Sequence, residues 1–229
     1  MKTEQFQIGT VPAILYGEPS DRAYLFLHGQ MGHKEEGEAF ARAAVRRGYQ
    51  VLSLDLPGHG ERRERREKLL PWTAAPEIRN VLNWAQDRWR SISLRANSIG
   101  AYFAMLTFAA PDRALLVSPI LDMERLILDM LGWAGVTEEQ LRERGEIETS
   151  FSQTLSWEFL CWVREHTPYI WTCPIYILYG GRDNMTSRKT VQEYVCRHRA
   201  QLTVMEHGEH WFHTPEQMAA LRAWEETYS

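Results

Sequence analysis

The stretch Ala96-Asn97-Ser98-Ile99-Gly100 decides how this chain is interpreted. It follows an apolar run at 92–95 and opens a second one at 99–110, which predicts a sharp turn from a strand into a helix. A serine at such a turn holds its hydroxyl clear of the sheet, where the first N–H groups of the helix face whatever the hydroxyl attacks. The pattern is G-x-S-x-G with alanine in place of the first glycine. Taken alone, it also fits a structural turn in which the serine caps the helix.

The composition is that of an ordinary globular protein. The chain has 229 residues, of which 44% are hydrophobic and 24% charged, with a net charge of −4. Acids and bases are interspersed, so nothing indicates a nucleic-acid partner, and no apolar window is long enough for a membrane span. The first residues lack the apolar segment of a signal peptide, and the three cysteines form no C-x-x-C pair. We therefore expect a cytoplasmic protein with reduced thiols.

Segments with strand and helix patterns alternate along the chain. A hairpin at 6–8 and 13–16 is followed by apolar runs typical of buried strands, at 23–27, 49–54, 92–95, 114–117, 175–179 and 201–205. Helices are expected between them, at 35–47, from Pro76 onward, after Ser98, at 187–199 and at 216–226. This alternation predicts the α/β class, with a mainly parallel, doubly wound sheet covered by helices on both faces.

Two segments do not fit the alternation. The run at 61–68 mixes acids and bases and is expected to form a solvated, salt-bridged loop or helix. The region 119–171 is far longer than a simple connection, so we expect a helical cap or lid inserted into a core formed by 1–118 and 172–229. Its apolar residues either line a substrate pocket or pack the cap against itself. The candidate pocket residues are Met31, Met123, Leu126 and Trp133.

A nucleophilic serine needs a base and a group that orients the base. Asp183 follows the expected strand at 175–179, and histidines stand at 207, 210 and 213 after the last strand. Because the carboxyl ends of parallel strands meet at one edge of a sheet, these residues are expected to lie near Ser98. Asp122, after the strand at 114–117, is the alternative acid. The spacing of the histidines also permits a metal site, but no carboxylate or thiol cluster accompanies them, so we expect no metal.

The turn at 28–32 supplies the remaining part of such a site. It follows the strand at 23–27, and its glycines allow a backbone N–H to face a carbonyl oxygen that becomes an oxyanion. The expected donors are the N–H groups of Gln30 and of Ile99, the residue after the serine.

Together these motifs resemble the α/β-hydrolase fold family, in its serine esterase and lipase-like form. The resemblance covers nearly the whole chain and rests on motifs in the order of the family: His28-Gly29, the segment 55–60, the turn 96–100, the segment 180–183 and Gly208-Glu209-His210. It implies that Ser98 is the nucleophile, Asp183 the acid and His210 the base, while His28 and His59 are structural. Ala96 is the one departure, and it leaves this turn slightly more crowded.

The resemblance implies hydrolysis of carboxylic esters through an acyl-enzyme, without a cofactor. Serine at the turn disfavours the relatives that use aspartate or cysteine there. The expected substrate is a small to medium, partly apolar ester. Thioesterase and acylglycerol lipase activities remain alternatives, as does a protein of this fold that binds a small molecule without turning it over.

Overall fold

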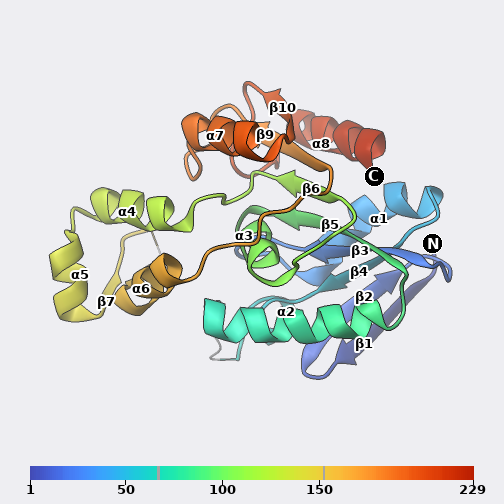
Figure 1. Cartoon of the computed structure of the whole chain (residues 1–229), viewed down its shortest axis with the longest axis horizontal. Helices are drawn as coiled ribbons and strands as arrows, with labels where there is room; N and C mark the ends of the chain where they lie inside the picture. Colours follow the sequence, from blue (N-terminus) through green and yellow to red (C-terminus); the bar gives the residue numbers. More distant parts are fainter. Residues whose placement is uncertain (66–67, 152) are drawn as a thin grey trace.

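The computed structural model describes residues 1–65, 68–151 and 153–229, and within them an eight-stranded sheet forms the centre of the molecule (Figure 1). The strand order is β1 (Thr3–Ile8), β2 (Val11–Tyr16), β4 (Gln50–Leu54), β3 (Arg22–Leu27), β5 (Ser91–Asn97), β6 (Ala114–Val117), β9 (Ile175–Gly180) and β10 (Gln201–Met205). β1 and β2 form an antiparallel hairpin, β2 is antiparallel to β4, and the strands from β4 to β10 are parallel. The expected mainly parallel sheet is confirmed.

Helices cover both faces of this sheet. Side chains alternate between the faces of each strand: on β3, Tyr24 and Phe26 pack with α1 (Gly37–Arg46) and α8 (Pro215–Tyr228), whereas Leu25 and Leu27 belong to the core on the other face. That second face is covered by α2 (Pro71–Gln86), α3 (Ser98–Thr107) and α7 (Arg188–His198). Short 3-10 turns occupy Lys34–Glu36 and Gly60–Arg62.

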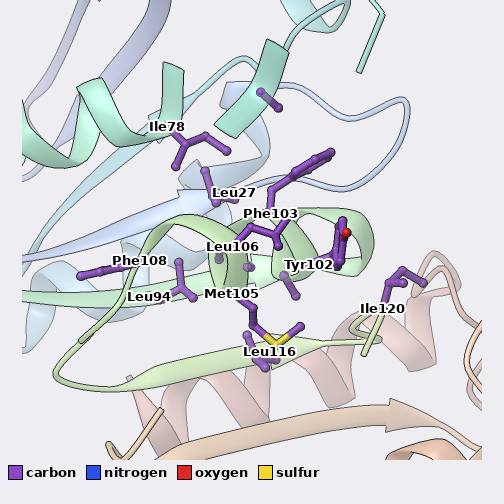
Figure 2. Packing of buried hydrophobic residues seen from close by; sticks show 14 of the residues in the cluster. Leu27, Ile78, Leu94, Tyr102, Phe103, Met105, Leu106, Phe108, Leu116 and Ile120 are labelled. Atoms are coloured by element: carbon purple, nitrogen blue, oxygen red, sulfur yellow. The ribbon is translucent and has the colours of Figure 1, made fainter. Parts of the chain in front are cut away.

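α3 is the most enclosed of these helices, because apolar side chains surround it. Figure 2 shows Phe103, Met105 and Leu106 of this helix among Ile78 of α2, Leu94 of β5 and Leu116 of β6. Burying each Leu, Met or Phe side chain contributes about 1.5–3 kcal/mol. The helix that begins at Ser98 is therefore held rigidly against the sheet.

The long connection between β6 and β9 forms a separate group of elements, seen at the left of Figure 1. It contains α4 (Met123–Ala134), α5 (Glu138–Arg144), the antiparallel pair β7 (Glu146–Glu148) and β8 (Thr154–Ser156), and α6 (Trp157–Glu165). Gly135, with a φ of 66°, ends α4 in the left-handed conformation typical of helix C-termini. Arg164 of α6 pairs with Glu124 of α4 and Glu138 of α5, which ties the three helices together.

The predicted start of α2 requires correction. The helix expected from Pro76 begins at Pro71, which occupies the first helical turn, where a missing N–H costs nothing. Pro76 lies within α2 on its exposed side, and burial of Ile78, Val81, Leu82 and Ala85 on the other side holds the helix together despite the lost hydrogen bond.

The charged run at 61–68 is salt-bridged as expected but not uniformly solvated, because the Arg62 side chain is buried and bonds both oxygens of Glu77. Arg66 and Glu67 of this run, and Ser152 of the 119–171 segment, lie outside the described residues. In the part of the chain that the structure describes, no helix is both long and apolar enough to cross a membrane.

Candidate active site

The loops that follow the parallel strands bring Ser98, His210 and Asp183 together. Ser98 follows β5, Asp183 follows β9, and His210 follows β10. The hydroxyl Oγ of Ser98 lies 2.8 Å from Nε2 of His210, and Nδ1 of His210 lies 2.7 Å from Oδ2 of Asp183. With a carboxylate at Nδ1, this nitrogen carries the proton and Nε2 accepts from the serine hydroxyl.

The turn at Ser98 is tight and strained. Ser98 has a φ of 46°, a conformation that non-glycine residues rarely adopt. A Cβ atom added to Gly100 would lie 2.4 Å from the carbonyl oxygen of His28, so only glycine lets α3 approach this closely. The Ser98 carbonyl accepts a hydrogen bond of 3.1 Å from the N–H of Ile120, which adds a support from the loop after β6.

Ala96 is the second-last residue of β5, where it pairs with Leu27 of β3 and Leu116 of β6, and its side chain is fully buried in the apolar core. Close approaches in the turn occur at Gly100 and at Gly29, where an added Cβ would lie 3.3 Å from Cβ of Ser98. The alanine therefore packs like any other small strand residue.

Asp183 is held by the backbone of its own loop. Oδ1 accepts the N–H groups of Met185 and Thr186, at 2.8 and 3.0 Å, and this leaves Oδ2 for His210. The carboxylate is fully buried, and the Thr186 hydroxyl fastens the loop to the carbonyl of Pro119. Both carboxylate oxygens are thereby engaged as acceptors, which fixes the orientation of the imidazole.

Asp122, the alternative acid, has another contact. Its side chain caps α4 by accepting the N–H of Arg125 at 2.9 Å. Of the other two histidines, His213 stacks on Trp211, and His207 lies 3.5 Å from Arg182. Within the described residues, no group of three or more His, Cys, Asp or Glu side chains is arranged to hold a metal ion.

The turn after β3 is fixed by a buried histidine. Nδ1 of His28 donates to the carbonyl of Gly29 at 2.7 Å, and Nε2 accepts the N–H of Leu56 at 3.1 Å. Burial lowers the pKa of His28 to about 4, so the ring is neutral near pH 7 and keeps one donor and one acceptor. Gln30 lies within this turn, and Ile99 lies in the first turn of α3, where an amide N–H has no partner within the helix.

A cavity of about 360 Å³ opens beside Ser98. Gln30 and Ile99 line it together with the serine, and one face of α4 forms a wall through Met123, Leu126, Ile127 and Met130. Two of the residues expected to line the pocket do not. Met31 is 77% exposed in a left-handed turn, and Trp133 lies almost a helical turn beyond Met130, where it packs on Phe151.

Sequence reasoning missed several lining residues. His59 follows β4, so the rule that places loops at the edge of the sheet could have found it. Lys68 and Phe159 reach the cavity from the segment before α2 and from α6. No local pattern indicates these two, because their position depends on tertiary packing between the segment before α2 and the 119–171 segment.

The sequence matches a known protein family over most of its length. The Alpha/beta hydrolase family matches residues 24–224, most of the chain. The chain belongs to this family. No curated protein matches it significantly as a whole sequence.

Solved structures of this α/β hydrolase fold are similar over nearly their full length. Est1E from Butyrivibrio proteoclasticus, solved with ferulic acid bound, has 16% identity and a TM-score of 0.76, covering 98% of this chain and 97% of its own. The alpha/beta hydrolase domain-containing protein 10 from mouse has 12% identity and a TM-score of 0.76, over 99% and 98%. A thioesterase domain from the curacin biosynthetic pathway has 18% identity and a TM-score of 0.61, over 98% and 99%. At these identities the likeness concerns the fold.

Proposed function

We propose that the chain is a serine hydrolase that cleaves carboxylic esters of small to medium, partly apolar substrates. The observation that carries this proposal is the hydrogen-bonded series Ser98–His210–Asp183, with distances of 2.8 and 2.7 Å, whose serine lines a cavity. A serine hydroxyl is a weak nucleophile until an adjacent base takes its proton. Here the base is in place and is itself oriented by a buried carboxylate.

In the first half-reaction, Oγ of Ser98 forms a bond to the ester carbonyl carbon while Nε2 of His210 takes the hydroxyl proton. The carbonyl oxygen becomes an oxyanion, which the backbone N–H groups of Gln30 and Ile99 stabilise. Asp183 stabilises the imidazolium. The carbon–oxygen bond to the alcohol then breaks, and His210 passes its proton to the departing oxygen, which leaves an acyl group on Ser98.

Water completes the reaction. Its oxygen bonds to the acyl carbon as His210 takes a proton, the bond to Oγ of Ser98 breaks, and the proton returns to the serine. The products are the carboxylic acid and the regenerated enzyme.

We also propose that the 119–171 segment is a cap over this site. Its elements α4, β8 and α6 contribute walls to the cavity beside Ser98. Two contacts join the segment to the rest of the molecule near the cavity: Lys68 bonds Glu146 of β7, and Trp72 of α2 packs edge-on against Phe159 of α6. Such a cover excludes water from the reacting ester.

The test combines labelling by a small fluorophosphonate with hydrolysis of p-nitrophenyl and thioester substrates. Wild type is expected to be labelled and active, and Ser98→Ala is expected to lose both. Ser118→Ala is the matched control, because Ser118 directly follows the neighbouring strand β6, also has a positive φ of 43°, and has a buried hydroxyl without a hydrogen-bond partner among the described residues. A folded wild type that is neither labelled nor active would indicate a binding protein instead.

A further inference from the structure

The helix α4 begins beside the nucleophile and runs away from it. The N–H of Ile120 donates to the carbonyl of Ser98, so the chain enters this segment in contact with the serine. α4 starts three residues later at Met123 and extends toward the far end of the 119–171 segment (Figure 1). Successive residues along α4 therefore lie farther and farther from Ser98.

One face of α4 lines the cavity. Its lining residues, Met123, Leu126, Ile127 and Met130, have the spacing of a single helical stripe. At 1.5 Å per residue, this stripe is about 10 Å long. All four side chains are uncharged and apolar, and the two methionines adapt to an unbranched chain more readily than stiff side chains do.

The position of His210 decides which part of the ester enters the cavity. His210 gives its proton to the departing alcohol, so the alcohol must lie on the histidine side of Ser98. None of the residues 206–213, the loop that carries His210, lines the cavity. The cavity therefore receives the acyl group, which lies on the other side of the reacting carbon.

We propose that α4 sets the length of the acyl group: the enzyme takes a linear aliphatic acyl chain laid along the stripe from Met123 to Met130. A carbon chain with bonds of about 1.5 Å and angles near 111° advances about 1.25 Å per carbon, so a 10 Å stripe accommodates about eight carbons. The cavity volume of about 360 Å³ lies toward the small end of the range for ligand sites. This inference rests on the proposed esterase activity.

The experiment measures kcat/KM for p-nitrophenyl esters from acetyl to dodecanoyl, with the alcohol held constant. Wild type is expected to reach its maximum near octanoyl. Met130→Trp fills the far end of the stripe and should lower the value for octanoyl and longer chains about tenfold relative to the butyryl value. Leu126→Trp, closer to Ser98, should extend the loss to hexanoyl.

Arg125→Trp is the matched control, because it adds the same bulk to the exposed face of the same helix, and it should leave the length profile unchanged. If Met130→Trp does not fold, Met130→Ala tests the opposite change and should raise the relative value for dodecanoyl. A flat length profile, or an equal effect of Met130→Trp on all chain lengths, would overturn the acyl assignment while Ser98 is still labelled. Absence of labelling and of all ester hydrolysis would overturn the esterase activity, and the acyl assignment with it.

Discussion

The guanidinium of Arg95 donates from Nε and Nη2 to one carboxylate oxygen of Glu225, at 3.0 and 2.8 Å. Both side chains are buried, and burial lowers the pKa of Arg95 and raises the pKa of Glu225. Nη1 of Arg95 also donates to Oδ1 of Asn97, the residue before Ser98, at 2.6 Å. Arg95 belongs to β5, the strand that ends just before Ser98, and Glu225 to α8, the helix that follows the His210 loop. The ion pair therefore joins the two elements that carry the serine and the histidine.

Replacing Arg95 alone should be severely destabilising. Arg95→Met leaves the Glu225 carboxylate buried without a cation, and we expect the free energy of unfolding to fall by about 3–5 kcal/mol. Urea denaturation followed by tryptophan fluorescence measures this loss. The double variant Arg95→Met/Glu225→Leu removes both charges and should recover most of it. A loss of less than about 1 kcal/mol in the single variant would contradict this role for the pair.

Gly100→Ala should disrupt the turn at the nucleophile. The added Cβ would lie 2.4 Å from the His28 carbonyl oxygen and 2.8 Å from that of Leu27, so α3 and the turn after β3 must separate. Since displacements near 1 Å cost about a hundredfold in rate, ester hydrolysis is expected to fall by that order. Circular dichroism verifies folding. A folded variant with full activity would show that the close approach is dispensable.

The comparison variant for this prediction is Ala96→Gly, which restores the glycine of the serine motif. Ala96 pairs with Leu27 within the sheet and is buried in the apolar core, so the change should mainly loosen the strand. We expect a loss of about 0.5–1 kcal/mol in stability and unchanged ester turnover. A gain in turnover would mean that the alanine does strain the turn.

The sequence predicts that Ser98, Asp183 and His210 lie close together because the order of the strands and the geometry of a parallel sheet largely determine where their loops lie. Alternating strands and helices imply a parallel sheet, and a parallel sheet places the loops after β5, β9 and β10 at one edge. The loop after β10 holds three histidines, however, and spacing alone does not choose between them. In the structure, a Cβ on Gly180 would lie 2.4 Å from the Glu209 carbonyl oxygen, so the loops after β9 and β10 pack tightly next to His210, a tertiary contact that the spacing of the histidines does not predict.

The cavity walls are the part that the sequence does not predict well. Met123 and Leu126 reach the cavity because the apolar stripe of α4 faces it. Trp133 continues the same apolar pattern but lies past the end of the cavity, and the exposed Met31 belongs to a turn that directs it outward. Hydrophobicity identifies which side chains avoid water, whereas contact with a particular cavity depends on tertiary packing.

The two candidate acids are distinguished by a pair of isosteric variants. Asp183→Asn removes the negative charge beside Nδ1 of His210 and offers a donor there, which favours the wrong imidazole tautomer, so we expect ester hydrolysis to fall by about three to four orders of magnitude. Asp122→Asn keeps a good helix cap on α4 and should leave hydrolysis unchanged. A loss confined to Asp122→Asn would reverse the assignment.

His28 should make the protein less stable in mild acid. Burial lowers its pKa from 6.5 to about 4, so between these values the unfolded chain binds a proton that the folded protein excludes. Stability is therefore fully present above about pH 6.5 and is lost as the pH falls toward 4. From about pH 7 to about pH 5 this single group should remove about 2 kcal/mol from the free energy of unfolding.

In His28→Gln the amide keeps a donor and an acceptor but does not titrate, and the other acidic and basic groups are the same in both proteins. Urea denaturation at the two pH values should therefore show a smaller decrease in the variant, and an equal decrease in both proteins would mean that His28 is not the group responsible.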